Sequence, residues 1–191
     1  MSTTPSPVPS VAPLDVQLLQ TAAALENLAA KLYTVAAGLS AVASGQGRLR
    51  ALTARNLAHH TSHAAAFNQA VVALGGAEQH AIDARYTGLI QRVTATKDPV
   101  SLATLLEEVE DLMAQTFARF APLAGAAGVR SLFVDTASVE AQHGSELLIV
   151  LTPPDGSGPG PGPGSGSGTA GIPRAVYPTA EASAVNEGAV R

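Results

Sequence analysis

Apolar residues recur at every third or fourth position along most of the chain, which is the spacing of an amphipathic α-helix. This spacing predicts four long helices, over about residues 14–43, 48–74, 99–122 and 129–151. Residues that favour helix starts support two of them: Pro13 precedes the first, and Asp98 followed by Pro99 opens the third. The period is helical rather than alternating, so the chain is predicted to be all-α.

The lengths of the connections predict how these helices are arranged. Short glycine-containing turns join the first helix to the second and the third to the fourth. The second and third are separated by residues 75–98, in which a short helix is expected around residues 85–93. Two antiparallel hairpins joined by one long crossover form a four-helix bundle that differs from the simple up-down-up-down bundle.

The two ends of the chain differ in composition from the middle. Residues 152–191 hold nine of the eighteen glycines and seven of the thirteen prolines. Such a segment cannot bury a core, so we expect a disordered tail after a folded domain of residues 14–151, and a disordered N-terminus over residues 1–13. The short apolar stretch 172–178 is either part of a frayed tail or a docking peptide for a protein partner.

Composition and charge exclude several classes of function. The 191 residues include no cysteine, which excludes disulfides, thiolate metal sites and cysteine nucleophiles. Aromatic residues make up 4% and the net charge is −4, so neither nucleic acid nor an anionic membrane is expected as a partner. The sequence shows no targeting signal and no membrane-spanning stretch, and we therefore expect a cytoplasmic protein.

Because only 14% of the residues are charged, an ionisable side chain on an apolar helix face is informative. Six such residues lie on predicted inward faces: Glu26, His60, His63, Glu110, Glu140 and His143. Beside Glu110, we predict that Glu108 and Asp111 face solvent and that Glu107 lies at the boundary. Isolated buried carboxylates are costly, so groups of this kind are normally paired or bound to a metal.

The levels of these six residues along the helices agree. In the first hairpin, the acid lies about 20 residues before the turn and the histidines about 15 after it. In the second hairpin, the acid lies about 16 residues before the turn and the Glu-x-x-His pair about 14 to 17 after it. At a rise of about 1.5 Å per residue, all of them fall near the middle of the bundle, where a single metal cluster would account for every one.

Three stretches carry a family resemblance. Residues 25–33 read Leu-Glu-Asn-Leu-Ala-Ala-Lys-Leu-Tyr, the fourth helix contains Val139-Glu140-Ala-Gln-His143, and the third contains Glu110-Asp111 followed by Phe117 and the Ala-Pro-Leu of residues 121–123. Together they resemble the ferritin-like di-metal carboxylate family, in particular its bacterial branch, in which two helices each supply a Glu and two others each supply Glu-x-x-His. The resemblance covers residues 14–151 and implies a ferritin-like four-helix bundle.

One position departs from the family pattern. Where the family has Glu-x-x-His on the second helix, this chain reads His60-Thr-Ser-His63. A carboxylate can bridge two irons and balance their charge, whereas a neutral histidine is expected to bind one metal terminally. The chain therefore offers three Glu and three His, and the site could hold two metals, one metal, a different metal or none.

If the site is intact, the resemblance implies iron or manganese, two ions per chain, used for iron oxidation or for oxygen or peroxide chemistry. Glu26 and His63 would then serve one metal, Glu110 and His143 the other, with Glu140 bridging and His60 as a terminal ligand. Tyr33, one or two helical turns from Glu26, would be a redox neighbour. The activity would be that of a di-metal oxidase or a peroxide-scavenging oxidoreductase.

Each of the six residues also has an ordinary structural interpretation. Glu140 and His143 could form a plain helical pair, Glu26 could pair with Lys31 or Arg55, Glu110 could belong to a solvated acidic face, and the histidines could cap the bundle flank. On that interpretation the protein is a metal-free ferritin-like scaffold that presents its tail to a partner. In either case the alanine-rich helices favour a homodimer.

Overall fold

The structure, a computed structural model, describes residues 13–44 and 47–151, and within them all elements are helices. They are α1 (Leu14–Ala37), α2 (Ser40–Ser44), α3 (Gly47–Ala73), η1 (Ala84–Tyr86), α4 (Gly88–Ala95), α5 (Pro99–Phe120), η2 (Ala121–Leu123) and α6 (Ala127–Leu151). The N-terminal residues 1–12 and residues 152–191, which include the apolar stretch 172–178, lie outside the described residues.

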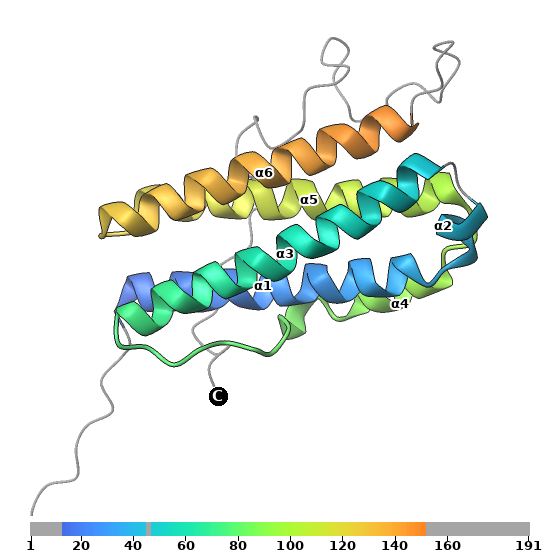
Figure 1. The fold of residues 1–191 in the computed structure, drawn as a ribbon. Coiled ribbons are helices and arrows are strands. Elements are labelled where there is room, and N and C mark those ends of the chain that lie inside the picture. The colour runs from blue at the N-terminus through green and yellow to red at the C-terminus, as the bar shows by residue number, and fades with distance from the viewer. Residues whose placement is uncertain (1–12, 45–46, 152–191) are drawn as a thin grey trace, which may run out of the picture.

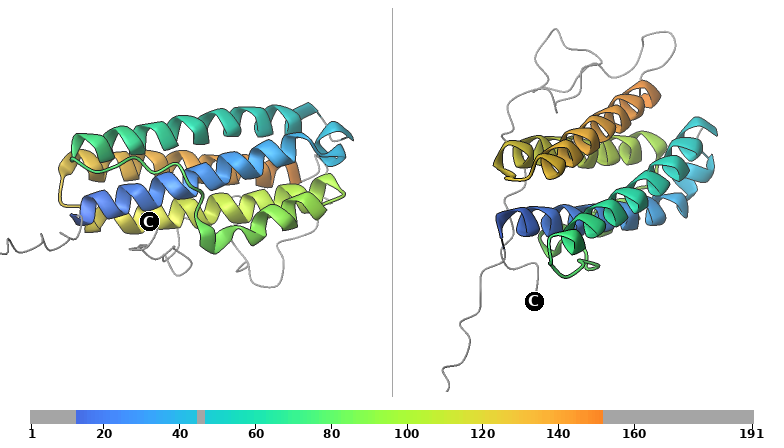
Figure 2. Two further views of the ribbon diagram at one scale, coloured as in Figure 1. Left: turned by 90° about the horizontal axis from the view of Figure 1, so that it is seen from below. Right: turned by 60° about the vertical axis from the view of Figure 1, so that its left-hand side comes forward.

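The long helices form two hairpins that lie against each other. α1 packs along α3, and α5 packs along α6, while a crossover carrying η1 and α4 connects the two pairs (Figure 1). Seen from other sides, the α1–α3 pair and the α5–α6 pair make two layers, with α4 against α1 (Figure 2). The predicted all-α bundle of two hairpins and one long crossover is confirmed.

The first predicted helix is divided. α1 ends at Ala37 instead of continuing to residue 43, and the short α2 follows after Gly38 and Leu39. Glycine is a weak helix former, so the break is cheap at Gly38. It also allows Ala41 and Val42 to turn into the core, where both are buried, and α2 to contact α5.

Polar side chains tie the crossover to the bundle. The Asn68 side chain on α3 bonds both the amide nitrogen and the carbonyl oxygen of Gln79, at 2.8 and 3.0 Å. Asn27 on α1 donates to the same carbonyl at 3.0 Å. At the far end of the crossover, the Asp98 carboxylate accepts a hydrogen bond from the Ser101 amide at 2.8 Å, which confirms the predicted start of α5.

The core between the two hairpins is aromatic on one side of the bundle's middle. Phe67, Phe117, Phe120 and Phe133 are essentially fully buried, and Phe67 contacts both Phe117 and Phe133 with ring centroids 5.3 and 5.5 Å apart. This aromatic layer lies about one to three helical turns from the level of the inward ionisable residues. Within the described residues, none of the helices combines the length and apolar character needed to cross a membrane.

Candidate metal centre

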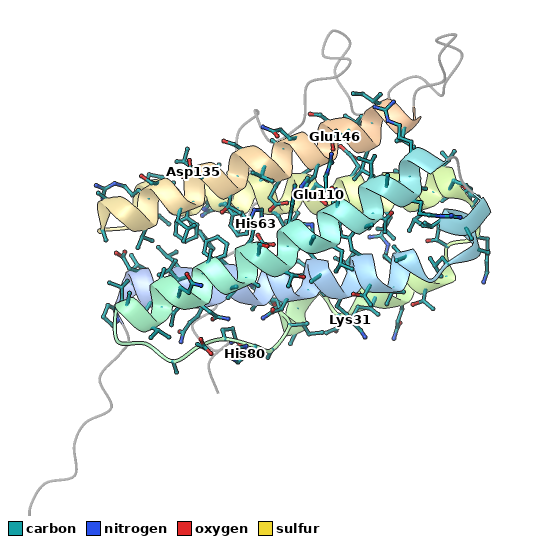
Figure 3. All side chains as sticks on the ribbon, in the orientation of Figure 1. Lys31, His63, His80, Glu110, Asp135 and Glu146 are labelled. Carbon is teal, nitrogen blue, oxygen red and sulfur yellow. The ribbon has the colours of Figure 1, made fainter. Side chains whose placement is uncertain are left out.

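The four long helices bring all six predicted residues to one place. Glu26 comes from α1, His60 and His63 from α3, Glu110 from α5, and Glu140 and His143 from α6. Five of them are buried, and the His63 side chain is 18% exposed. Their ligand atoms form two overlapping groups, each lying within 4.8 Å. Two of the six residues, His63 and Glu110, are labelled near the middle of the bundle in Figure 3. The levels calculated from helix rise therefore predicted the cluster correctly.

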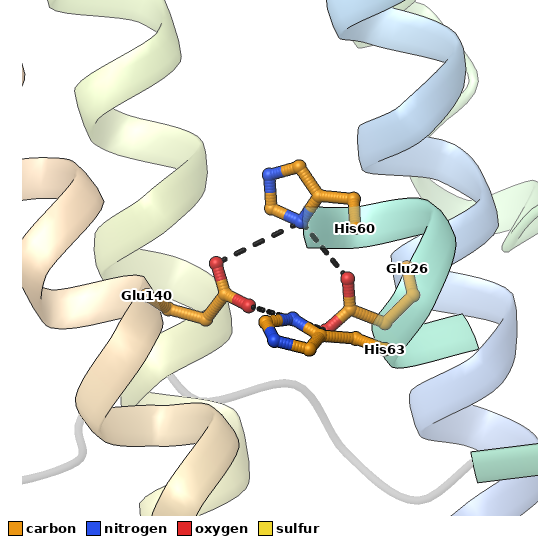
Figure 4. A group of neighbouring side chains, drawn as sticks. All are labelled: Glu26, His60, His63 and Glu140. Atoms are coloured by element: carbon orange, nitrogen blue, oxygen red, sulfur yellow. Dashed lines mark hydrogen bonds and ion pairs between the residues drawn. The ribbon is translucent and has the colours of Figure 1, made fainter. Parts of the chain in front are cut away.

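The first group consists of Glu26, His60, His63 and Glu140 (Figure 4). Nδ1 of His60 lies 2.9 Å from Oε2 of Glu26, and Nδ1 of His63 lies 2.8 Å from Oε1 of Glu140. The two pairs are cross-linked, because Nδ1 of His63 is also 3.4 Å from Oε1 of Glu26. Two imidazoles and two carboxylates from three helices thus face a common point.

The second group consists of His60, Glu110, Glu140 and His143. Nε2 of His60 lies 3.3 Å from Oε1 of Glu110. Nδ1 of His143 lies 3.1 Å from Oε2 of Glu140 and 3.4 Å from Oε2 of Glu110. His60 and Glu140 therefore belong to both groups, and the other four residues belong to one each.

Two carboxylates of the centre, Glu26 and Glu140, have pKa values shifted in opposite directions. Burial and the nearby charge of Glu140 raise the pKa of Glu26. Burial acts to raise the pKa of Glu140 as well, but the charge of His60 and hydrogen bonds from His143 and His63 outweigh it and hold that pKa well below its usual range. Glu140 is therefore the carboxylate of this pair that is held ionised.

The carboxylates also shift the pKa values of His60, His63 and His143. Burial lowers the pKa of each of these histidines, but the charges of the neighbouring carboxylates and the hydrogen bonds to them raise it by more. The charges of Glu110 and Glu140 raise the pKa of His60 well above its usual range, and hydrogen bonds to Glu140 and Glu26 raise that of His63 to about 9. A metal that binds these nitrogens must displace protons, so metal and proton compete for the centre.

The residues present fit a divalent transition metal. Metal–ligand bonds of about 2.1 Å place neighbouring ligand atoms about 3.0–3.5 Å apart, close to the separations found in both groups. Among the described residues, Oε1 of Glu26 and Oε2 of Glu110 are buried and are met only by a histidine nitrogen at 3.4 Å, a long contact that leaves each oxygen poorly satisfied. Buried oxygens of this kind are costly unless something binds them. Mixed carboxylate and imidazole donors suit iron, manganese and zinc.

Three further side chains surround the centre. The Tyr33 hydroxyl donates to Oε1 of Glu110, and Asn56 Nδ2 donates to the Tyr33 oxygen at 3.2 Å. On the solvent side, Nδ1 of His59 lies 2.9 Å from Nε2 of His143, with the two rings stacked. His59 cannot be selected from the sequence, because it stands beside the inward line of α3 and reaches the centre through His143.

The structure corrects one assignment near Glu110 and excludes several ordinary interpretations. Asp111 is fully buried rather than solvent-facing, and Glu107 is also buried.

Arg55 pairs with Glu146, whereas Glu26 contacts His60 and His63. Glu110 does not belong to a solvated acidic face and His60 does not cap the flank of the bundle, because neither side chain is exposed to solvent. The predicted positions of Glu108 at the surface and of Glu140 beside His143 are confirmed.

Comparison with known proteins matches the chain to a family model. The family model described as a ferritin-like domain matches residues 14–152, which include all six residues of the centre. No curated protein and no solved structure matches the chain significantly.

Proposed function

The chain belongs to the ferritin-like domain family, and from this membership we propose that it binds iron or manganese at the centre of its bundle for redox chemistry. The ligands are Glu26, His60, His63, Glu110, Glu140 and His143. The chemistry is iron oxidation or the consumption of oxygen or peroxide, and two ions per chain is the full complement. The observation that carries this proposal is the pair of overlapping ligand groups, which share His60 and Glu140 in a buried space.

The position of each residue around the centre determines its proposed role. Glu140 directs Oε1 toward His63 and Oε2 toward His143, so its carboxylate joins the two groups. The Tyr33 hydroxyl donates a hydrogen bond to Oε1 of Glu110, which places a phenol directly against a ligand of the centre. The aromatic layer around Phe67 and Phe133 keeps water from one side. When bound, iron or manganese supplies the redox couple that these side chains lack.

The test compares oxygen and peroxide consumption by the full chain after loading with Fe²⁺ or Mn²⁺. Glu140→Ala removes the carboxylate that joins both groups, so we expect it to lose all metal-dependent consumption together. His80→Ala is the matched control, because His80 lies on the crossover with its side chain 73% exposed, away from the centre (Figure 3). Equal activity in Glu140→Ala and the parent would refute these roles.

A second function is favoured by a specific observation, namely that His60, His63 and His143 each bond to a carboxylate of the protein. Such pairing partly satisfies the polar core without a metal, as a scaffold that dimerises and presents its tail would require. A ligand that binds only the folded state must raise its melting temperature. A rise with Fe²⁺ or Mn²⁺ favours the metal centre, and an unchanged melting temperature with both favours the scaffold.

A further inference from the structure

His60 occupies the middle of the centre with a carboxylate at each ring nitrogen. Its side chain has no exposed area. Nδ1 lies 2.9 Å from Glu26 of the first hairpin, and Nε2 lies 3.3 Å from Glu110 of the second. The two nitrogens of an imidazole point away from each other across the ring, whereas the two oxygens of a carboxylate share one carbon. His60 thus reaches toward opposite sides of the centre, which a glutamate at this position could not do in the same way.

The remaining ligands separate according to these two nitrogens. On the Nδ1 side are Glu26 and His63, whose nearest atoms are 3.4 Å apart. On the Nε2 side are Glu110 and His143, again with nearest atoms 3.4 Å apart. Glu140 lies between the two sides: Oε1 is 2.8 Å from Nδ1 of His63, and Oε2 is 3.1 Å from Nδ1 of His143 and 3.7 Å from Nδ1 of His60. Each side therefore holds its own acid, its own histidine and one nitrogen of His60, and the Glu140 carboxylate is shared between them.

The orientation of the His60 ring is fixed by its neighbours. The Tyr33 ring lies on one side of it, with centroids 5.0 Å apart, and the His143 ring meets it edge-on at 5.4 Å. Turning the ring would break its contacts with Glu26 and Glu110 at once. The division of ligands between the two nitrogens is thus built into the packing and does not depend on a mobile side chain.

We propose that His60, having released its ring protons to solvent and become an imidazolate, is a bridging ligand that binds one metal through Nδ1 and a second through Nε2. The inference rests on the proposed metal-binding function and specifies how the centre is built. It replaces the expectation from sequence that His60 is a terminal ligand and that Glu140 alone bridges. The substitution of His for Glu on α3 then changes the separation of the two metals without removing either of their sites.

The metal–metal separation is the consequence that can be measured. Two-metal sites commonly place their ions about 3.5–4 Å apart. Bonds of about 2.0–2.1 Å from each nitrogen, directed away from each other across the ring, add to the width of the ring itself. The two ions at His60 therefore lie well beyond 4 Å, with the imidazole between them.

The experiment loads the full chain with Fe²⁺ without oxygen, and measures iron per chain by mass spectrometry and iron–iron scattering by X-ray absorption. We expect two irons per chain and no iron–iron signal at about 3–4 Å. His60→Glu restores the family's Glu-x-x-His, so it is the matched control, and there we expect two irons with a signal in that range.

The outcomes separate this inference from the function on which it rests. One iron per chain, or an iron–iron signal at about 3–4 Å in the parent, overturns the His60 bridge and leaves metal binding standing. No bound iron overturns the proposed function itself. A His60→Glu variant that binds two irons without the short separation overturns the assignment of the spacing to His60. The parent protein alone decides the first two outcomes, whether or not the variant folds.

Discussion

The Tyr33 hydroxyl donates a hydrogen bond to Glu110, and both side chains are fully buried between α1 and α5. Burial, then the charge of Glu110, raises the pKa of Tyr33 well above its usual range, so the phenol keeps its proton. Tyr33→Phe removes the donor from Glu110 and the acceptor from Asn56. We expect a loss of about 1–3 kcal/mol in the free energy of unfolding, measured by urea denaturation of metal-free protein. An unchanged value would show that this bond contributes nothing to folding.

His59 supports the centre through His143. Burial and the neighbouring charge of His143 lower the pKa of His59, which favours a neutral ring that can accept a hydrogen bond. Because Nδ1 of His143 faces the carboxylates, its Nε2 is left to donate to Nδ1 of His59 at 2.9 Å. Outer partners of this kind orient a ligand histidine, and losing one typically weakens metal binding about 10–100-fold.

We therefore expect His59→Leu to weaken Mn²⁺ binding at least about 10-fold in a calorimetric titration. His59→Asn is the matched variant, since its side-chain oxygen can accept the same hydrogen bond, and it should recover most of the affinity. If the two variants bind Mn²⁺ equally well, His59 has no role in positioning His143.

The stability of the metal-free protein should depend on pH. Burial lowers the pKa of His63, but hydrogen bonds to Glu140 and Glu26 raise it to about 9, against about 6.5 in the unfolded chain. A raised histidine pKa stabilises the fold below the unfolded value, and that stabilisation is lost as pH rises through the folded value. The free energy of unfolding, measured in chelator, should therefore fall between about pH 6.5 and 9. In His63→Gln this fall should be smaller, and an equal fall in both proteins would contradict the assignment.

The end of α3 has no room for a side chain at Gly76. Gly75 has a φ of 77°, and the amides of Gly75 and Gly76 bond back to Val72 and Val71 at 2.9 Å, which closes the helix. A Cβ at Gly76 would lie 2.6 Å from Val16 Cγ1 and 2.9 Å from Val71 Cγ1.

Gly76→Ala should therefore lower the free energy of unfolding by about 1–3 kcal/mol, through overpacking of stiff valine side chains. Gly128→Ala is the control, because a Cβ there meets no atom within 4 Å and alanine favours the helix. Thermal denaturation of both variants would measure the difference, and equal melting temperatures would contradict the close approach.

The bundle and the centre could be predicted from the sequence because an α-helix has a constant rise per residue, so the number of residues from a turn gives a residue's position along the bundle axis. The apolar period fixed the inward faces, and the rise per residue placed Glu26, Glu110 and Glu140 at one level before any contact was known. The connection lengths decided which helices pair. These are properties of single helices and of turns, and they need no knowledge of neighbouring surfaces.

The surroundings of Asp111, His59 and His60 could not be predicted in this way, because they depend on how other helices pack against these residues. Asp111 was assigned to solvent because one apolar stripe was assumed, but α5 is contacted by α1, α2 and α6 and is buried on more than one face. A Cβ added at Gly144 of α6 would lie only 3.6 Å from Oδ1 of Asp111, so this acid faces a helix and not water. The role of His59 depends on the position of His143, which α3 alone does not determine. The contacts at the two nitrogens of His60 likewise depend on Glu26 and Glu110, which come from two other helices.

The measurement that tests the central claim most directly is the metal content of the full chain expressed with iron and manganese, determined by mass spectrometry. The double variant Glu140→Ala, His143→Ala is measured beside the parent, since it removes the two α6 ligands of the centre. We expect about two metals per chain in the parent and none in the variant. Near-zero metal in both, or equal metal in both, would contradict a metal centre built from these residues.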